Sequence, residues 1–207
     1  MNKGTLAVIS GFSGVGKGTA VKELVSRYPY ALSVSATTRD PRPGEVDGVA
    51  YHFISKEAFE DKIREGDFFE WASYVDQYYG TPKSYVLEEL AKGHDVILEI
   101  EAAGAMKVKE QLPEAILIYM LPPSMQELKR RLVGRGTETE EKIEKRLKKA
   151  REEELGIARK YDFLIVNDDL EACIRELHRI IQTRTGIAPG RSDLLERLES
   201  EVLENRV

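Results

Sequence analysis

The sequence predicts an α/β fold of three layers, in which helices cover both faces of a parallel sheet. Apolar segments typical of buried strands, such as 95–101, 115–121 and 162–166, alternate with segments of helical periodicity. This alternation is characteristic of a parallel sheet whose strands are joined by crossover helices. A glycine-rich loop also joins the first apolar strand, 6–9, to an amphipathic segment that begins at residue 20. A strand, a glycine loop and a helix in this order predict a phosphate-binding site.

The glycine loop, GFSGVGKGT at 11–19, fits the P-loop pattern Gly-x-x-x-x-Gly-Lys. Glycines let backbone N–H groups turn toward one point, the helix dipole adds positive potential there, and Lys17 adds a full charge. The next position should be Ser or Thr to bind Mg²⁺, but it is Gly18, with Thr19 one place later. The alternative is a glycine-rich turn that opens an ordinary Rossmann-like unit. The correctly spaced lysine favours a nucleoside triphosphate site.

Composition excludes several classes of protein. The formal net charge of −5 argues against a general nucleic-acid binder. The single cysteine, Cys173, excludes an internal disulfide and a cysteine-rich zinc site, and its apolar neighbours predict a buried helical thiol. No stretch approaches the roughly 20 apolar residues of a membrane span, and the first strand begins too early to leave room for a signal peptide. We therefore expect a soluble, cytoplasmic protein.

The other expected elements follow from periodicity and from turn residues. Ser55 is the predicted N-cap of one helix, and Gly66 and Gly93 are predicted to end two helices. Two prolines restrict the polar segment 36–45, so we expect a loop there. The remaining strands are expected at 31–35, 49–54, 68–75 and 78–80, and the helices at 56–64, 82–92, 104–111, 124–133 and 170–184.

This order of elements suggests four parts. They are a nucleotide-binding core at 1–34, 82–130 and 155–184, a small β-rich insert at 35–81, a helical lid at 131–154 and a C-terminal helical extension at 185–207. The lid is expected because a segment of mixed charge lies next to glycines, and the alternative is an ordinary solvated helix. Leucines at helical spacing in the extension predict a helix that packs on the body or on a partner subunit. The second alternative would make a homodimer.

Polar side chains follow several of the expected strands. In open parallel sheets, ligands bind beyond the carboxyl ends of the strands, so we expect Lys17, Ser35, Glu99, Glu101 and Asn167 to be neighbours. Glu99 and Glu101 are two apart on a predicted strand and would point to one face. We expect two buried carboxylates, one near a metal ion and one that binds substrate. The alternative is a strand end in water with two solvated charges.

Three arginines form a second candidate group. Arg131 and Arg135 are four apart on a predicted helix, and Arg146 lies in the predicted lid. Guanidinium groups that converge on a transferring phosphoryl group would stabilise its charge. The alternative is ion pairing at the surface with Glu127, Glu138 and Glu141. The spacing alone does not decide between these two interpretations.

The insert contains a set of residues suited to a phosphate monoester. Arg39 and Arg42 offer bidentate cations, and Tyr51 and Tyr79 offer phenolic donors. Tyr51 could instead be a half-buried residue of a sheet. The three histidines share no spacing, and phosphoryl transfer needs none because positioning and charge neutralisation supply most of the catalysis.

Seven motifs together resemble those of the guanylate kinase family. They are GFSGVGK, SVSATTRDPRPGE, YYGT, LEIE, LPPS, GRGTE and IVNDD, and they span about residues 5–184 in the expected order. The family transfers the γ-phosphoryl group of ATP to GMP, with Mg²⁺, and yields ADP and GDP in purine nucleotide metabolism. The resemblance implies this activity for the present chain, with dGMP as a further acceptor.

The resemblance also implies roles for individual residues. The ATP site would comprise Gly11, Ser13, Gly14, Val15, Gly16, Lys17, Gly18, Thr19, Arg131, Arg135 and Asn167, with Asn167 near the adenine. The GMP site would comprise Ser35, Arg39, Arg42, Tyr51, Glu70, Tyr79, Thr81 and Glu101. The catalytic residues would be Lys17, Arg39, Arg131, Arg135 and Arg146. Glu70 and Glu101 would accept hydrogen bonds from guanine, and Ser35 and Thr81 would donate to its O6 atom.

Some positions depart from the common pattern of the family. Phe12 replaces a usual proline, Gly18 replaces a usual serine, and Glu99 and Glu101 replace aspartates. We expect Mg²⁺ to be held mainly by nucleotide phosphates and water, with Glu99 bound to that water rather than to the ion, because Mg²⁺ gives up its water reluctantly.

Two other functions remain as alternatives. A guanylate-kinase-like binding domain without catalysis tends to lose the loop lysine, whereas Lys17 is retained here. A P-loop kinase for another phosphate monoester would not need the base-reading residues Ser35, Glu70, Thr81 and Glu101.

Overall fold

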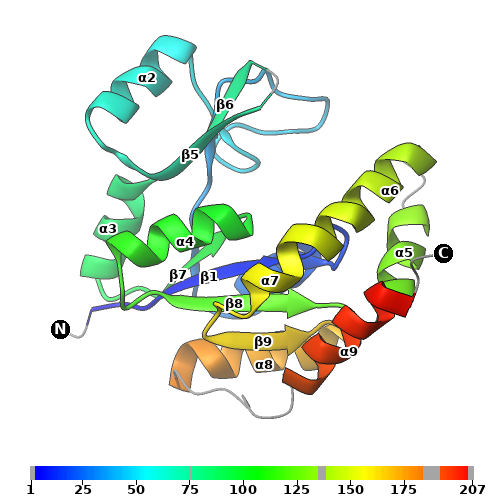
Figure 1. Cartoon of the computed structure of the whole chain (residues 1–207). Coiled ribbons are helices and arrows are strands. Elements are labelled where there is room, and N and C mark those ends of the chain that lie inside the picture. The colour runs from blue at the N-terminus through cyan, green and yellow to red at the C-terminus, as the bar shows by residue number, and fades with distance from the viewer. Residues whose placement is uncertain (1–2, 75, 135–138, 184–191, 205–207) are drawn as a thin grey trace. The chain divides into compact units, whose positions relative to one another are not determined.

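A computed structural model describes residues 3–74, 76–134, 139–183 and 192–204 (Figure 1). The strands are β1 (Leu6–Gly11), β2 (Ala31–Leu32), β3 (Ala36–Thr37), β4 (His52–Phe53), β5 (Phe68–Tyr74), β6 (Gln77–Pro82), β7 (Val96–Glu99), β8 (Ile116–Leu121) and β9 (Phe163–Val166). The helices are α1 (Lys17–Arg27), α2 (Lys56–Arg64), α3 (Lys83–Ala91), α4 (Ala102–Gln111), α5 (Met125–Gly134), α6 (Glu140–Lys149), α7 (Leu155–Ala158), α8 (Leu170–Thr183) and α9 (Ser192–Glu204), with a π-helical turn η1 (Ala150–Glu154) before α7. Within these ranges, no helix is long and apolar enough to cross a membrane.

The larger of two sheets has five strands in the order β2-β7-β1-β8-β9 and is flanked by helices. β2 pairs in parallel with β7, and β8 pairs in parallel with β9. β8 is buried along its whole length, as expected of a parallel strand that is covered on both faces. The predicted α/β class with a parallel core sheet is confirmed.

The chain divides into two compact units, Met1–Ala7 with Pro29–Ala115 and Val8–Tyr28 with Ile116–Val207. The first unit contains a second sheet of four strands in the order β4-β3-β6-β5. Helix α2 packs against this sheet through Phe59, whose ring stacks on Phe68 at a centroid distance of 4.4 Å. A Cβ at Gly80 would lie 2.9 Å from Phe68 and 3.0 Å from Phe59, so glycine allows this close approach. The predicted β-rich insert therefore forms its own apolar cluster.

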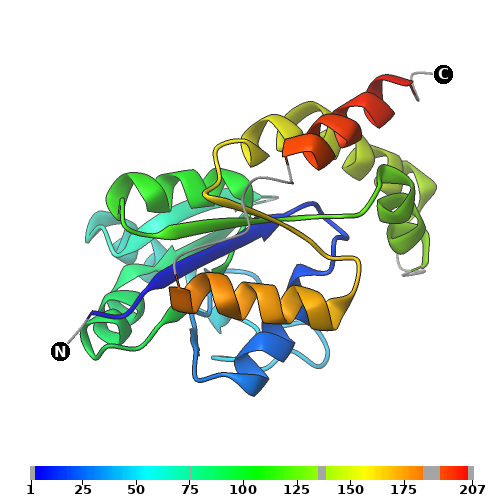
Figure 2. The same ribbon diagram turned by 90° about the horizontal axis from the view of Figure 1, so that it is seen from below.

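In the second unit, α8 lies beside α1 (Figure 2). Arg27 of α1 forms a bidentate ion pair with Glu171 of α8, with N–O distances of 2.6 and 2.7 Å. The apolar face of α8 is buried and includes Cys173, which confirms the predicted buried thiol.

Residues 125–134 and 140–158 form the helices α5 and α6, the turn η1 and the helix α7. Ser124 caps α5, since its hydroxyl accepts a hydrogen bond from the Glu127 N–H over 3.0 Å. Ile143 and Leu147 of α6 are buried, each 6% exposed, so this charged helix has a narrow apolar stripe. Residues 135–138, which include Arg135 and belong to the predicted lid, lie outside the described residues.

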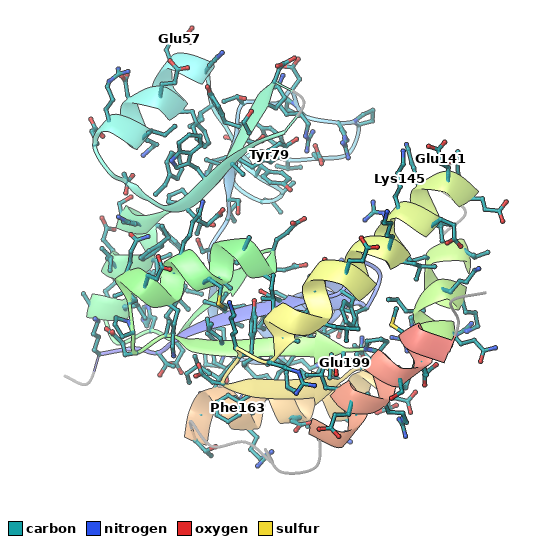
Figure 3. All side chains as sticks on the ribbon, in the orientation of Figure 1. Glu57, Tyr79, Glu141, Lys145, Phe163 and Glu199 are labelled. Atoms are coloured by element: carbon teal, nitrogen blue, oxygen red, sulfur yellow. The ribbon has the colours of Figure 1, made fainter. Side chains whose placement is uncertain are left out.

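The C-terminal helix α9 packs on the body of its own chain. Leu195 and Leu198 are 1% and 0% exposed. Glu199 (Figure 3) forms a bidentate ion pair with Arg159, and the Glu201 carboxylate accepts a hydrogen bond from the Met125 N–H at the start of α5 over 3.0 Å. The predicted helix is present, and its packing matches the first of the two alternatives. A homodimer stays a prediction.

Four predicted segments differ from the structure, each at or next to a short strand. The segment 36–45 is not entirely loop, because Ala36 and Thr37 form β3 and pair with Gly80 and Tyr79. The strands expected at 31–35 and 49–54 contain only Ala31–Leu32 and His52–Phe53. The strand expected at 95–101 ends at Glu99, and Glu101 is the N-cap of α4. Short strands depend on pairing with distant segments, which local periodicity does not reveal.

The packing of α9 leads to a stability prediction. Leu198→Ala should lower the free energy of unfolding by about 2–5 kcal/mol, because it leaves a cavity at a fully buried position. Urea denaturation measures this change. Leu87→Ala is a matched control, since Leu87 is a helical leucine that is 42% exposed, and its cost should stay below about 1 kcal/mol. Equal, small effects of the two substitutions would contradict the packing of α9 on the body.

Candidate functional site

The phosphate loop in the second unit has the geometry of an anion site. Gly14 and Gly16 have φ values of 93° and 99°, a region that side chains with a Cβ rarely adopt. Gly16 is the N-cap of α1 and brings no capping side chain, and the first turn of α1 contains no acidic residue. The first N–H groups of a helix lack partners within the helix, so this turn can donate to an anion.

The side chains of Asn167 and Arg131 bind the loop at the carbonyl oxygen of Val15. The Asn167 side chain, which is 7% exposed, donates to the Val15 carbonyl oxygen over 2.8 Å. Arg131 donates to the same oxygen over 3.3 Å and to the Asn167 carbonyl oxygen over 2.8 Å. A Cβ at Gly16 would lie 2.6 Å from the Asn167 amide nitrogen. The loop conformation and the place of Asn167 therefore depend on one another.

Three of the predicted cations contact this loop. Lys17 Nζ donates to the carbonyl oxygens of Gly11 and Phe12 over 2.6 and 3.2 Å. Arg146 of α6 donates to the Ser13 hydroxyl, and Arg131 contacts Val15. The structure thus brings Lys17, Arg131 and Arg146 to the loop, whereas Arg135 lies outside the described residues.

Arg131 also forms an ion pair with Glu127, as the alternative interpretation of the arginines predicted. Its Nε donates to Glu127 over 2.7 Å, and Arg130 bonds both oxygens of the same carboxylate. These bonds lower the pKa of Glu127 to about 2. The pair leaves Nη1 of Arg131 directed at Val15 and Asn167, so ion pairing orients this arginine toward the loop. Glu141, another expected partner, pairs with Lys145 instead (Figure 3).

Phe12, where the family usually has proline, anchors the loop in the core. It is fully buried, and its ring meets Tyr119 of β8 edge to face at a centroid distance of 5.6 Å. Proline would restrict the backbone directly, whereas Phe12 restrains the loop through its buried side chain.

In the first unit, Arg39 is fixed by Glu45. Its two terminal nitrogens donate to the two Glu45 oxygens over 2.8 and 2.9 Å, and the Arg42 N–H donates to the same carboxylate over 2.7 Å. Hydrogen bonds lower the pKa of Glu45 to about 2. The side-chain bonds from Arg39 have the largest effect, and the bond from the Arg42 N–H adds to it. One carboxylate therefore connects both arginines of the predicted monoester site.

Both predicted tyrosines lie beside Arg39. The Arg39 guanidinium lies 5.4 Å from the centroid of the Tyr51 ring, and the Tyr51 and Tyr79 rings are 6.0 Å apart. Tyr79 lies on β6 (Figure 3). Burial raises the pKa of Tyr51, so its hydroxyl remains a donor at neutral pH. The structure groups Arg39, Tyr51 and Tyr79, as the sequence predicted.

Glu70 and Thr81 form a pair between β5 and β6. The Thr81 hydroxyl, on a residue that is 1% exposed, donates to Glu70 Oε1 over 2.8 Å. Burial raises the pKa of Glu70, and the Thr81 hydrogen bond opposes this effect. A hydroxyl has one proton to donate, so Thr81 orients Glu70 here and cannot donate to a second acceptor at the same time. Ser35 lies immediately before β3, and its carbonyl oxygen accepts from the His52 N–H over 2.9 Å.

The expectation that Glu99 and Glu101 are buried on one face of a strand was wrong. Both residues are exposed. The strand ends at Glu99, and Glu101 has the extended backbone of a helix N-cap, so the alternation of a strand does not reach it. In the described part of the chain, no group of three or more His, Cys, Asp or Glu side chains could hold a metal ion.

Sequence reasoning assigned no role to Glu45 and treated Glu127 only as a competing partner. Glu45 follows Gly44, whose φ of 87° reverses the chain and returns the carboxylate to Arg39. Glu127 is three and four residues before Arg130 and Arg131, a spacing that favours ion pairs on a helix. The helical spacing was available from the sequence, whereas the turn at Gly44 was not.

Comparison with known proteins decides the family. A family model for guanylate kinase matches residues 3–184. The chain belongs to the guanylate kinase family. A guanylate kinase of Clostridioides difficile is 49% identical over 204 residues, which are 98% of this chain and 99% of that protein. A guanylate kinase of Clostridium tetani is 54% identical over 181 residues, 87% of this chain and 86% of that protein.

A solved structure supports the same conclusion. The crystal structure of guanylate kinase from Anaplasma phagocytophilum superimposes with a TM-score of 0.70 at 29% identity, and the match covers 95% of this chain and 96% of that one. The resemblance inferred from the seven motifs is therefore confirmed. The individual site residues remain predictions.

The pairing of Glu45 with Arg39 leads to a prediction. Glu45→Gln should raise the KM for GMP by about three- to tenfold, because an amide offers one acceptor where a carboxylate offers two. The KM for ATP should not change. Glu57→Gln is a matched control, since Glu57 is exposed on α2 of the same unit (Figure 3).

The same pair should be insensitive to pH near neutrality. Because the folded pKa of Glu45 is lowered to about 2 from a usual 4.5, the pairing is complete above the unfolded value and is lost only as the pH falls toward the folded one. The ratio of KM values, variant to wild type, should therefore stay constant between about pH 6 and 9. A KM that falls in the variant would mean that Glu45 competes with the GMP phosphate.

Proposed function

We propose that this nucleoside monophosphate kinase phosphorylates GMP, and also dGMP, with ATP by direct in-line transfer in purine nucleotide metabolism. The observation that carries the proposal is the phosphate loop with Lys17, Arg131 and Arg146 bonded to it. A binding domain without catalysis would not need these cations around an intact loop. The names of the relatives support GMP as the phosphoryl acceptor, since those proteins are guanylate kinases.

In this proposal the second unit binds ATP. The N–H groups at 14–19 and Lys17 would bind the phosphates, and Asn167 would support the loop. Arg131, Arg135 and Arg146 would balance the charge that spreads over the equatorial oxygens as the phosphoryl group moves. The segment 131–154 would act as a lid that excludes water from the reacting phosphates.

The insert at 35–81 would bind GMP. Arg39, Arg42, Tyr51 and Tyr79 would bind the phosphate. Glu70 and Glu101 would accept from the guanine N1–H and 2-amino groups, and Ser35 would donate to O6. With its proton committed to Glu70, Thr81 would act by orienting that carboxylate. A site built to hydrogen-bond these groups of guanine rejects a mismatched base by factors of roughly 10⁴.

We assign Mg²⁺ as the cofactor, held mainly by nucleotide phosphates and water. The donor set fits this arrangement, because Gly18 has no side chain and Glu99 is an exposed carboxylate at the end of β7. Glu99 would accept from water on the ion. When bound, Mg²⁺ would neutralise charge on the phosphates. A cytoplasmic location and a homodimer remain predictions from the sequence, as does the absence of nucleic-acid and membrane partners.

An assay of ADP release with GMP, dGMP, AMP and UMP tests the proposed activity. We expect turnover with GMP and dGMP, and rates lower by about 10³-fold or more with AMP and UMP. Lys17→Ala should abolish the activity, whereas Lys22→Ala, an exposed lysine of the same helix, should retain it. Failure to turn over GMP would refute the proposal. Turnover of another phosphate monoester in its place would support the alternative kinase.

The proposed mode of Mg²⁺ binding predicts that Gly18→Ser changes little. The Mg²⁺ concentration that gives half-maximal turnover should shift by less than about threefold, because phosphates and water already complete the shell of the ion. A titration of Mg²⁺ at saturating nucleotides measures this value. A large gain in apparent affinity would show that the wild-type loop lacks a hydroxyl ligand.

A further inference from the structure

The Glu70 side chain lies against the first turn of α4 at Gly104, which has no side chain of its own. Gly104 is the third residue of this helix. A Cβ built on Gly104 would lie 3.0 Å from Glu70 Cγ, 3.1 Å from Cδ and 3.2 Å from Oε2. All three distances are shorter than ordinary van der Waals contact. Glu70 therefore occupies the space that a side chain at position 104 would fill.

The carboxylate is held on its other side as well. Oε1 accepts the hydrogen bond from Thr81 over 2.8 Å, and Oε2 is the oxygen next to Gly104. The N-terminal turn of a helix also favours a negative charge. Glu70 thus has one preferred place, between the Thr81 hydroxyl and the backbone of α4.

The strand that carries Glu70 cannot easily move away from α4. Gln111 of α4 donates to the Phe69 carbonyl oxygen over 2.6 Å, and Lys107 donates to the Trp71 carbonyl oxygen over 3.4 Å. These two bonds fix β5 to the helix on both sides of Glu70. A methyl group at position 104 would therefore displace the flexible Glu70 side chain rather than the strand.

We propose that Gly104 is a positioning residue for guanine recognition: its missing side chain lets Glu70 take the place in which Thr81 orients it toward the base. This inference rests on the proposed function of Glu70 as an acceptor for guanine. A residue larger than glycine would shift the carboxylate and weaken its hydrogen bonds to the base. Gly104 itself touches no substrate.

Gly104→Ala tests this role, and its expected effects separate recognition from stability. The KM for GMP should rise about tenfold, as for the weakening of one hydrogen bond to a charged group. The KM for ATP should change by less than about twofold, because the phosphate loop is unaffected. The midpoint of thermal unfolding should be unchanged or higher, since alanine favours a helix more than glycine does. A purely structural role would instead lower the midpoint.

Gly156→Ala is the matched control. Gly156 is also a helical glycine, in α7, and a Cβ there would meet nothing within 4 Å. This variant should leave both KM values within about twofold of wild type. An equal rise in the KM for GMP in the two variants would overturn the proposal.

A second variant shows whether Gly104 acts through Glu70. In the Glu70→Ala background the atoms that the new methyl group would contact are gone, so adding Gly104→Ala should change kcat/KM for GMP by less than about twofold. A tenfold loss that persists in this background would overturn the inference alone. If Glu70→Ala by itself leaves kcat/KM for GMP unchanged, the proposed role of Glu70 and the role of Gly104 both fail.

Discussion

The hydrogen bond from the Asn167 side chain to the Val15 carbonyl oxygen is the constraint on which the proposed ATP site depends. It fixes the phosphate loop at the turn that Gly14 and Gly16 allow, and Arg131 reinforces it through the same oxygen. Because the loop is held by its carbonyl side, its N–H groups and the first turn of α1 are left to face an anion. A cradle formed before the ligand arrives avoids the cost of ordering the loop upon binding.

The two units use the same device to orient an arginine. Glu127 holds Arg131 in the second unit, and Glu45 holds Arg39 in the first. The pKa of each carboxylate is lowered to about 2, so both remain charged throughout the neutral range. Thr81 and Gly104 fix Glu70 in a comparable way, by a hydrogen bond on one side and backbone on the other. Three candidate binding groups, Arg131, Arg39 and Glu70, are thus each oriented by neighbouring residues.

The sequence allowed the phosphate loop, the parallel sheet and the family to be predicted, because glycine spacing, apolar periodicity and ordered motifs are local patterns. It misplaced Glu99 and Glu101, because where β7 ends depends on packing rather than on the alternation of residues. β3 was missed because Ala36 pairs with Gly80, which is distant in the chain. The roles of Glu45 and Gly104 depend on a turn and on a contact between two elements, and neither has a signature in a single sequence.

Asn167 supports the loop through the Val15 carbonyl oxygen, whereas the family resemblance places this residue near the adenine. Calorimetric titration of Asn167→Ala with ATP and with inorganic tripolyphosphate, both with Mg²⁺, separates these roles. If Asn167 supports the loop, both ligands should bind more weakly by a similar factor, about 5- to 30-fold, because one buried hydrogen bond is lost. Weaker binding of ATP with unchanged binding of tripolyphosphate would contradict the account and assign Asn167 to the base.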